Sequence, residues 1–406
     1  MKILYLSQYF PPEMGAPSAR VHELSREWVR LGHQVTVLTG FPNHPTGVVP
    51  PEYRGELFRR ETVDGIQVVR APIYAAANKG LFRRALNYVS YCAGASAVGP
   101  FATGQPDVII ATSPQFLTGL AGLWLSALKR VPFVFEVRDL WPRSIVAVGA
   151  LKAGSLPVRA LERLERLLYA RADRIVVVSE PFVDEIAALG VPREKLSVVQ
   201  NGVDLALFAP QDRAQARRVL GLPAGAFLAS YVGTHGLAHG LGTLLESAAL
   251  LRDTNVLLLL VGEGAEKAQL RDRARDLPNV LFWDQRERTE VARILAASDV
   301  ALVLLRNQPL FRTVLPSKLF EIMGAGRAIV STVDGEARRL VEAAGAGFFS
   351  PPEDAEALAL LLRDLARDPS RLAALGASGR AFVEENYSRP ALARRYLAIL
   401  EQVVKR

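Results

Sequence analysis

Short apolar runs alternate with amphipathic segments along almost the whole chain, and this alternation constrains the fold more than any other feature. Apolar runs bounded by turn residues are typical of buried strands, and apolar residues three or four positions apart are typical of helices that cover a sheet. The pattern therefore predicts an α/β fold with parallel sheets and crossover helices. Residues 57–74 differ, because their alternation around Asp64-Gly65 predicts a hairpin.

The predicted strands form two series that follow one another. The first comprises residues 2–7, 34–39, 107–111, 132–137, 174–179 and 196–199, and the second comprises 227–232, 255–261, 279–283, 300–305 and 328–333. A helix is expected at 18–31, and residues 353–406 are expected to be helical with breaks near Pro369 and Pro390. With 406 residues, the chain is long enough for two doubly wound domains, joined by the turn-forming segment 200–204.

Charge and cysteine content narrow the class of protein. The net charge is +8, and the excess lies in residues 1–174, where 21 Lys and Arg face 13 Asp and Glu. A basic first half suits a domain that meets an anionic surface, and a general preference for Arg over Lys is the alternative explanation. Cys92 is the single cysteine and the N-terminal apolar stretch is too short for a secretory signal, so we expect a reducing, cytoplasmic setting.

Ligands of open parallel sheets bind beyond the carboxyl ends of the strands, so the loops at those ends are the candidate sites. After the first strand, Gly15 and Ala16 would let a phosphate approach a helix N-terminus. The loop at 233–240 contains glycines, Thr234 and two histidines, and such a loop can surround phosphates with backbone N–H groups. His235 and His239 have no third partner in view, so zinc is not expected.

The segment 315–326 is the most informative in the chain. Pro316 and Ser317 are predicted to begin a helix, so that free N–H groups and the Lys318 ammonium converge on a diphosphate. Glu321 lies one turn further, where a carboxylate can accept hydrogen bonds from a ribose. The alternative is a capped helix on which Lys318 and Glu321 form a solvated i, i+3 pair.

Three further segments allow two interpretations each. Gly262-Glu263-Gly264 lacks the third glycine of a dinucleotide fingerprint, with Lys267 in its place, and indicates a tight turn more than cofactor binding. Arg138 and Asp139 end a predicted strand, where they either contact a ligand or form a structural pair.

The third segment is 85–106, which has no charged residue and follows Arg83 and Arg84. It carries Tyr88 and Tyr91 but is too polar to span a bilayer. It is predicted either to lie on a membrane with the basic pair at the headgroups or to be a buried core helix.

Taken together, these segments resemble the retaining glycosyltransferases of family 4, which have the GT-B fold. The resemblance covers essentially the whole chain and is carried by PPEMGAPS, VVSEPF, SVVQNGVD, YVGTHGLAHG, LLLVGEGAE and PSKLFEIMGAGRAIVSTVDGEARRLVEAAGAGF. The bacterial branch that assembles O-antigen, capsule and colanic acid is the most similar. The resemblance implies two Rossmann-like domains that face a cleft: an acceptor-binding domain over 1–204, joined by a C-terminal helix at about 388–406, and a donor-binding domain over 205–387.

The resemblance also implies roles for individual residues. Glu321 matches the second acid of the family's E-x7-E motif, while the first acid falls at Thr313, so Arg312 or Asn307 is expected to replace it. The usual basic pair of the diphosphate site falls at Thr234 and His239, which leaves neutralisation to Lys318, the amides of 316–318, and His235 or Arg138. The expected catalytic residues are Lys318, Glu321, Asp139 and Arg138. The expected donor-binding residues are Gly15, Gly233, Thr234, His235, Gly236, His239, Gly262, Glu263, Pro316, Ser317 and Leu319.

The implied activity is retaining transfer from a nucleotide-diphosphate sugar, most often UDP-linked and sometimes amino-deoxy, to a lipid-linked or envelope polysaccharide acceptor. Front-face attack needs no dedicated base, and no metal or other cofactor is expected. The implied location is the inner face of the plasma membrane, on an anionic surface met by Arg83, Arg84, Tyr88 and Tyr91. A sugar-nucleotide epimerase or hydrolase of the same fold is one alternative. A basic nucleic-acid-binding protein is another, although no binding module or basic-aromatic stripe supports a nucleic-acid partner.

Overall fold

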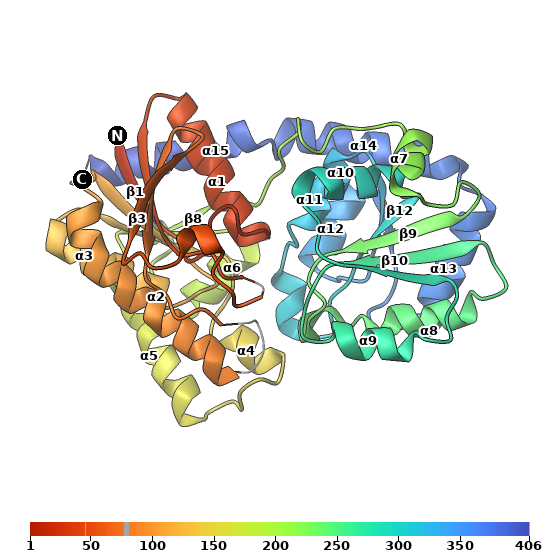
Figure 1. The fold of residues 1–406 in the computed structure, drawn as a ribbon, viewed down its shortest axis with the longest axis horizontal. Helices are drawn as coiled ribbons and strands as arrows, with labels where there is room; N and C mark the ends of the chain where they lie inside the picture. Colours follow the sequence, from red (N-terminus) through yellow and green to blue (C-terminus); the bar gives the residue numbers. More distant parts are fainter. Residues whose placement is uncertain (45, 77–80, 406) are drawn as a thin grey trace. The chain divides into compact units, whose positions relative to one another are not determined.

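The computed structural model describes residues 1–44, 46–76 and 81–405. These residues form two compact units, of which unit 1 comprises Met1–Gln200 with Arg389–Arg406 and unit 2 comprises Asn201–Ser388. Each unit contains one sheet with helices on both faces (Figure 1). The boundary between the units follows Gln200, at the start of the turn-forming segment that the sequence indicates. The α/β fold with two successive parallel sheets is therefore confirmed.

Unit 1 contains an eight-stranded sheet in the order β3-β4-β2-β1-β5-β6-β7-β8. The strands are β1 (Lys2–Leu6), β2 (Gln34–Gly40), β3 (Arg59–Val63), β4 (Ile66–Ala71), β5 (Val108–Thr112), β6 (Phe133–Val137), β7 (Arg174–Val177) and β8 (Leu196–Val198). β3 and β4 pair antiparallel around Asp64-Gly65, which confirms the predicted hairpin, and the other neighbours pair parallel. The chain reverses its direction of travel across the sheet between β1 and β5, so the loops after these two strands diverge and leave room for a ligand.

Helices cover both faces of the sheet of unit 1. They are α1 (Ala16–Arg30), α2 (Leu81–Ala102), α3 (Thr118–Lys129), α4 (Arg143–Ala147), α5 (Leu156–Arg171), α6 (Glu180–Ala187) and α15 (Arg389–Val404), with short 3₁₀ turns at Pro51–Tyr53 and Arg193–Lys195. The core beneath α1 and α15 contains Val37, Ile110 and Val134. The helices α2 and α3 instead contact Leu38 and Ala111, and successive residues of a strand point to opposite faces.

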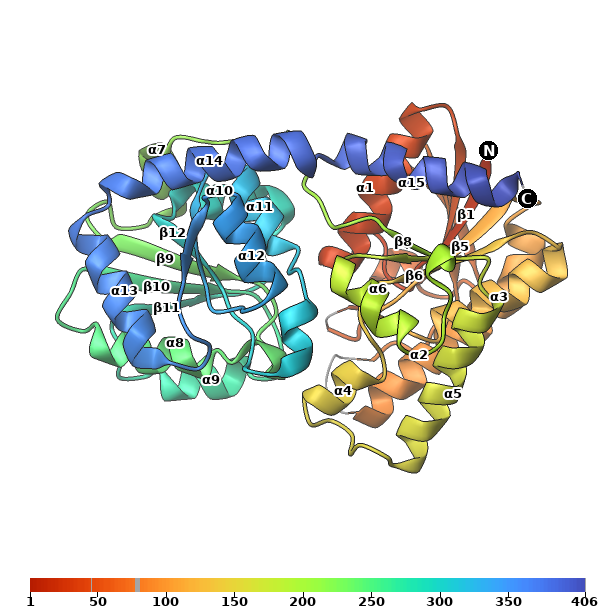
Figure 2. The same cartoon turned by 180° about the vertical axis from the view of Figure 1, so that it is seen from behind.

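The C-terminal helix α15 belongs to unit 1 and lies beside α1 in both views (Figure 1, Figure 2). The indole Nε1 of the fully buried Trp28 donates a hydrogen bond to the carbonyl of Ala393 at 3.0 Å. Tyr396 meets the Trp28 ring edge-on, and Arg389 Nε donates to Glu23 at 2.6 Å. Truncating a buried tryptophan costs about 3–5 kcal/mol, so this contact holds the returning helix firmly. The predicted return of the C-terminal helix to the first domain is confirmed.

Unit 2 contains a fully parallel six-stranded sheet in the order β11-β10-β9-β12-β13-β14. The strands are β9 (Phe227–Val232), β10 (Val256–Val261), β11 (Val280–Trp283), β12 (Val300–Val303), β13 (Ala328–Ser331) and β14 (Gly347–Phe349). The sequence does not predict β14, because three residues that begin with glycine make no recognisable strand pattern. Here the reversal point lies between β9 and β12, and it places the candidate ligand site of unit 2 at the loops after these strands.

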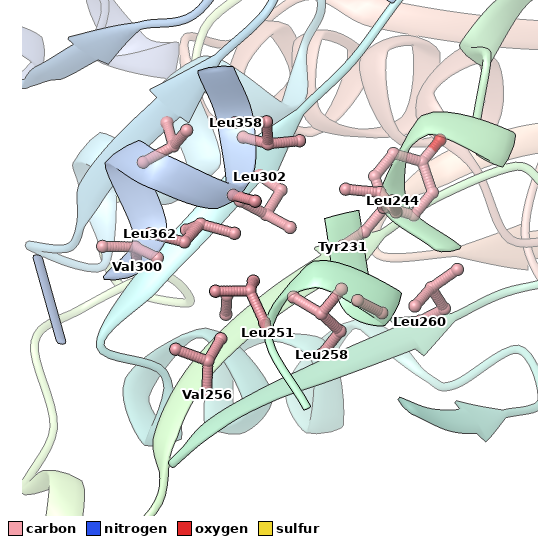
Figure 3. Packing of buried hydrophobic residues seen from close by; sticks show 14 of the residues in the cluster. Tyr231, Leu244, Leu251, Val256, Leu258, Leu260, Val300, Leu302, Leu358 and Leu362 are labelled. Atoms are coloured by element: carbon pink, nitrogen blue, oxygen red, sulfur yellow. The ribbon is translucent and has the colours of Figure 1, made fainter. Parts of the chain in front are cut away.

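Eight helices are described in unit 2, and a leucine-rich core lies against its sheet (Figure 3). The helices are α7 (Arg213–Leu220), α8 (Gly242–Leu250), α9 (Lys267–Arg273), α10 (Arg288–Ala297), α11 (Lys318–Gly324), α12 (Glu336–Ala343), α13 (Ala355–Arg367) and α14 (Ser370–Asn386), with 3₁₀ turns at Leu237–His239 and Pro309–Thr313. Tyr231, the penultimate residue of β9, belongs to this core (Figure 3). Core packing therefore holds its ring in place at the carboxyl end of the strand.

Candidate functional site

Lys318 is held over the ring of Tyr231 at the carboxyl end of β9. Its Nζ lies 3.9 Å from the ring centroid, a cation–π contact, and is buried with no hydrogen-bond partner among the described residues. A Cβ at Gly233 would lie only 2.6 Å from this Nζ, so glycine at 233 leaves the space that the ammonium fills. Burial lowers the pKa of Lys318 to about 7, against the opposing charge of Glu321. An anion beside Nζ would satisfy its hydrogen bonds and restore its charge.

The two histidines of the same loop flank Tyr231, with both ring centroids 6.0 Å from that of the tyrosine. Burial lowers the pKa of His235 to about 4 and that of His239 to about 3, and nearby lysines reinforce both shifts. Both rings are therefore neutral near pH 7. These shifts disfavour a positive charge on His235, and its expected part in neutralising a diphosphate stays a prediction.

The loop also presents hydrogen-bonding groups. Neither ring nitrogen of His235 has a partner among the described residues, although the side chain is fully buried. The carbonyl of Thr234 accepts a bond from Tyr231 Oη at 2.9 Å, so the exposed Thr234 side chain is held at the loop surface. The carbonyl of Gly236 accepts the amide of His239 at 2.9 Å in a 3₁₀ turn. These two bonds fix the backbone of the loop at Thr234 and Gly236.

The segment before α11 supplies fewer amides than the sequence predicts. Helix α11 begins at Lys318, and Pro316 has no N–H to donate. The amides of Leu319 and Phe320 already bond to the carbonyls of Pro316 and Ser317 at 3.0 and 3.2 Å, and the Leu319 side chain is fully buried in the core. Pro316 and Leu319 therefore offer no free amide to a diphosphate, and their expected donor contacts stay a prediction. The amides of Ser317 and Lys318 remain as candidates in this turn.

Glu321 is half-buried one turn beyond Lys318 and lies 3.5 Å from Arg288 Nη2. The solvated Lys318–Glu321 pair that local spacing allowed is not what the structure contains, because Lys318 Nζ is buried against Tyr231. The carboxylate of Glu321 is held by α10 instead. Sequence reasoning gave no role to Arg288, which stands in no recognisable motif, or to Tyr231, which begins the segment YVGTHGLAHG but reads as the end of an apolar strand.

The Gly262-Glu263-Gly264 turn supports the β9 loop from behind. A Cβ at Gly262 would lie 1.9 Å from the carbonyl oxygen of Gly233, and one at Gly264 would lie 2.2 Å from that of His235. The Glu263 carboxylate pairs with Lys267 at 2.5 Å, and the Glu263 carbonyl accepts the His235 amide at 2.8 Å. The two glycines therefore allow two loops to touch. This geometry favours the tight-turn interpretation, and the Glu263 carboxylate is engaged by Lys267.

A small pocket opens beside the loop after β12. It is lined by Leu305, Arg306, Asn307, Gln308, Phe311, Arg312, Thr332, Val333, Asp334 and Pro352. Both candidates for the missing first acid, Arg312 and Asn307, line it, whereas the Thr313 hydroxyl donates to the carbonyl of Leu310 at 2.7 Å. Thr332 Oγ1 is buried here without a partner among the described residues. The pocket therefore offers a hydroxyl, an amide and a guanidinium to a polar ligand.

In unit 1, Arg138 is bound to the loop that carries Gly15. Its Nη2 and Nη1 donate to the carbonyls of Ala16 and Pro17 at 3.1 and 3.4 Å, and its Nε is buried without a partner among the described residues. Burial lowers the pKa of Arg138 to about 10, against the charge of Glu136, so it is charged at neutral pH. Gly15 has φ +131°, a conformation that favours glycine.

The strand end that carries Arg138 is fixed by a buried ion pair between Glu136 and Arg20, 2.9 Å apart. Tyr5 Oη and Thr112 Oγ1 also donate to Glu136, at 2.7 and 2.6 Å. Burial raises the pKa of this carboxyl, but the charges of Arg20 and Arg138 outweigh it and hold the pKa below the usual value.

Burial raises the pKa of Asp139, and among the described ion pairs none joins it to Arg138. The structural pair considered for these two residues is therefore not observed. Arg138 is instead positioned by the carbonyls of the loop after β1.

Helix α2 combines a buried face and an exposed face. Tyr91 is fully buried and donates to the carbonyl of Leu38 at 2.8 Å, so its expected contact with a membrane is wrong. Arg83 and Arg84 are exposed, and Arg84 Nη2 donates to the half-buried Tyr88 hydroxyl at 3.1 Å. Among the described helices, none combines the length and apolar character needed to cross a bilayer. Within the same residues, no three His, Cys, Asp or Glu side chains gather as metal ligands would.

Comparison with known proteins matches each unit to a glycosyl transferase domain. A glycosyl transferase 4-like domain matches residues 15–202, and the glycosyl transferases group 1 domain matches residues 212–382. WcaI of Escherichia coli (strain K12), named for a glycosyl transferase role in colanic acid biosynthesis, is 27% identical over 89% of this chain and 91% of its own length. The D-inositol 3-phosphate glycosyltransferase 1 of Catenulispora acidiphila is 27% identical over 90% of this chain and 85% of its own.

Solved structures match the whole fold. The sucrose-phosphate synthase of Thermosynechococcus elongatus has a TM-score of 0.80 at 20% identity and covers 99% of this chain and 98% of its own. Anabaena HepE in complex with UDP and glucose has a TM-score of 0.75 at 19% identity, with 99% of both chains covered. The two matched domains and the relatives show that the chain belongs to the family 4 glycosyltransferases, and the solved structures show that it has the GT-B fold.

Proposed function

We propose that this enzyme is a retaining glycosyltransferase that moves a sugar from a UDP-linked donor to a lipid-linked or cell-envelope polysaccharide acceptor. The observation that carries the proposal is the Lys318 ammonium, which is buried over Tyr231 without a hydrogen-bond partner among the described residues. A buried, unpaired ammonium is costly unless an anion joins it. In a glycosyltransferase of this family, that anion would be the diphosphate of the bound nucleotide-sugar donor.

The donor would lie along the carboxyl ends of β9 and β12. Lys318 and the Gly233 loop would hold the diphosphate, and Glu321, steadied by Arg288, would accept hydrogen bonds from the ribose. Asn307, Arg312 and Thr332 would bind the hydroxyls of the sugar in the pocket after β12. UDP is the nucleotide of choice because HepE has been solved with UDP-glucose and with UDP and glucose.

The chemistry proposed for these residues is electrostatic. Charge develops on the leaving diphosphate as the glycosidic bond breaks, and a preorganised ammonium in a water-poor site stabilises that charge strongly. In front-face attack the departing phosphate oxygen takes the proton of the acceptor hydroxyl, so no separate base is required. Lys318 would replace the charge that a divalent metal supplies in other transferases. Transfer should accordingly proceed within about twofold of its normal rate after chelation with EDTA, and a larger loss restored by Mg²⁺ would contradict this assignment.

The acceptor would be reached at a membrane. WcaI carries the name of a colanic acid enzyme, and the N-terminal half of this chain is basic. On α2 the exposed Phe82 and Val89 lie on the same helix as Arg83 and Arg84. An anionic headgroup layer at the inner face of the plasma membrane would attract the two arginines while the apolar side chains enter its edge.

Ligand-induced stabilisation is the direct test of the donor. The purified protein should show a raised melting temperature with UDP or a UDP-sugar, and smaller shifts with GDP, TDP and ADP. Incubating the stabilising donor with and without a membrane extract that supplies acceptor then separates three activities. Product that appears only with the extract supports transfer. Free sugar or an epimerised donor in both samples would overturn the proposal in favour of a hydrolase or an epimerase.

A further inference from the structure

Hydrogen bonds connect four buried polar residues in series in unit 1. Gln8 Nε2 donates to Asn87 Oδ1 at 2.6 Å, and Asn87 Nδ2 donates to Asn43 Oδ1 at 3.2 Å. The backbone amide of Asn43 then donates to Glu13 Oε1 at 2.9 Å. Gln8, Asn87, Asn43 and Glu13 are each at most 6% exposed. They come from the loops after β1 and β2 and from α2, so three separate elements converge on this chain of bonds.

Both ends of the chain are unpartnered hydrogen-bond acceptors. At one end, Asn87 Nδ2 also donates to the carbonyl of Tyr74 at 2.7 Å, so Asn87 must present its oxygen to Gln8. Gln8 therefore turns its NH₂ inward and leaves Oε1 without a partner among the described residues. At the other end, Glu13 Oε1 accepts the amides of Asn43 and His44 at 2.9 Å each, while Oε2 has no partner there.

The identity of these two atoms restricts the ligand. Burying a hydrogen-bonding atom without a partner is costly, and native proteins rarely leave such atoms unsatisfied unless a water or ligand joins them. A carboxylate oxygen and an amide oxygen can only accept, so a partner must donate O–H or N–H groups. Phosphate oxygens are acceptors and would be repelled by the ionised form of Glu13, which predominates above pH 7. Sugar hydroxyls donate.

Aromatic rings surround the same strand ends. The ring of Tyr9, the residue after Gln8, lies 5.0 Å from that of His44. Tyr88, the residue after Asn87, meets Trp141 at 6.2 Å, and Trp141 stacks on Phe116 at an interplanar angle of 7°. Rings beside a few placed polar groups are typical of sites for ligands that have both apolar C–H faces and hydroxyls. The loop after β1 also lies at the reversal point of the sheet, where such sites occur.

We infer that Gln8 Oε1 and Glu13 Oε2 form the acceptor subsite and accept hydrogen bonds from hydroxyls of a neutral sugar. The inference rests on the proposed function and specifies its acceptor as a glycosyl unit rather than a bare lipid phosphate. A preceding transferase must then have placed that first sugar on the carrier.

Two substitutions test the two ends of the chain. Glu13→Gln keeps an oxygen for the amides of Asn43 and His44 but loses the charged acceptor, and Gln8→Met keeps the length of the side chain but removes the amide. Glu165→Gln is the matched control, because Glu165 is also a buried carboxyl of unit 1 whose pKa burial raises to about 7, yet its Oε1 is bonded to Tyr169 at 3.0 Å. Burial raises the pKa of Glu13 to about 7, so the measurement is made at pH 8, where the carboxyl is mainly ionised.

The readout is saturation-transfer NMR at saturating UDP. The probes are methyl glycosides of glucose, galactose, mannose and N-acetylglucosamine, with dodecyl phosphate as a lipid-phosphate probe. At least one glycoside should bind the wild-type enzyme, and its apparent Kd should rise by about fivefold or more in E13Q and Q8M, as expected for loss of a hydrogen bond to a charged or buried group. Its Kd should be unchanged in E165Q.

The controls separate this inference from the proposed function. Unchanged UDP affinity and melting temperature show that each variant is folded. Absence of UDP binding by the wild-type enzyme would overturn the proposed function itself. If UDP binds but no glycoside does, if glycoside binding is the same in E13Q and Q8M as in the wild type, or if dodecyl phosphate competes with the glycoside, the acceptor subsite inferred here is wrong while the donor assignment stands.

Discussion

The Lys318 ammonium lies 3.9 Å from the centre of the Tyr231 ring and 2.6 Å from the point where a side chain at residue 233 would begin. The ring belongs to the core of unit 2, so the ammonium rests on a rigid support (Figure 3). Rigidity matters because a charge that stabilises a leaving group acts best when it needs no reorganisation. The relationship links one strand, one loop and one helix, and each can be altered separately.

Replacing Lys318 by alanine should lower kcat by at least about tenfold, since charge on the leaving diphosphate would lose its stabilising partner. Glu321→Ala should have an effect of similar size through the ribose contact. Both variants should remain folded and unfold cooperatively, because neither side chain fills the core. Lys152→Ala, an exposed lysine of unit 1, is the control. Wild-type turnover in both variants would remove the assignment of this site.

The affinity for UDP should fall as pH rises above 7. The pKa of Lys318 is about 7 in the free protein, so the ammonium loses its proton above that pH. A bound diphosphate favours the charged form, and binding must then take up a proton, which weakens affinity by up to about tenfold per pH unit. Calorimetry between pH 6.5 and 9 should show this slope in the wild type and a flat profile in Lys318→Met. A wild-type profile as flat as that of the variant would contradict the shift.

The same pKa predicts the sign of a stability effect. Between pH 7 and 10.5 the unfolded chain holds a proton on Lys318 that the folded chain has lost, so the free energy of unfolding rises with pH across this window. Below pH 7 both states are protonated and the burial penalty is fully present. The melting temperature of the wild type should therefore rise relative to that of Lys318→Met as pH rises from 7 towards 10. Parallel melting curves for the two proteins would show that the folded pKa is ordinary.

A methyl group at residue 233 should weaken the site even though Lys318 itself is not substituted. Gly233→Ala places a Cβ 2.6 Å from Nζ and forces the ammonium off the Tyr231 ring, and φ +154° is unfavourable for alanine. We expect UDP affinity to fall by about fivefold or more and stability to fall by about 1 kcal/mol. Gly225→Ala is the matched control, because its Cβ would meet nothing within 4 Å. Equal UDP affinity in the two variants would disprove the space requirement.

Much of the fold could be predicted from local pattern, because buried strands are short apolar runs in this chain. The segment 227–232 is both the predicted strand and the observed β9, and the hairpin at Asp64-Gly65 is correct. The return of α15 to unit 1 was expected from family resemblance rather than from pattern. β14 was missed because Gly347–Phe349 is too short to make a period.

The site was harder to predict, because its contacts are not local. Lys318 was found because a lysine near a helix start suggests an anion, but Tyr231 looks like one more core residue of FLASYV. Glu13 lies in the same loop as Gly15, and no local pattern indicates that it is buried. Its burial depends on Asn43 and His44, which follow a different strand. For Pro316 the residue type alone is informative, since proline has no N–H to donate to a phosphate.

Membrane association should depend on the exposed face of α2. Arg83→Glu/Arg84→Glu should lower binding to vesicles that contain phosphatidylglycerol by at least about tenfold, because each basic residue near an anionic surface contributes about 1 kcal/mol. Phe82→Ser should weaken binding through lost apolar contact, since this side chain is 80% exposed. Raising the salt concentration should weaken wild-type binding to anionic vesicles and leave the weak binding to neutral phosphatidylcholine vesicles unchanged.

Arg252→Glu/Arg275→Glu is the control for this charge reversal, since both arginines are exposed on unit 2 and the change in net charge is the same. UDP affinity should be equal in both double variants, which would show that unit 2 is intact. If the two double variants sediment with anionic vesicles to the same extent, attraction depends on overall charge and not on α2. If only the α2 variant is released, the basic excess of the N-terminal half has a function there, and compositional bias no longer accounts for it.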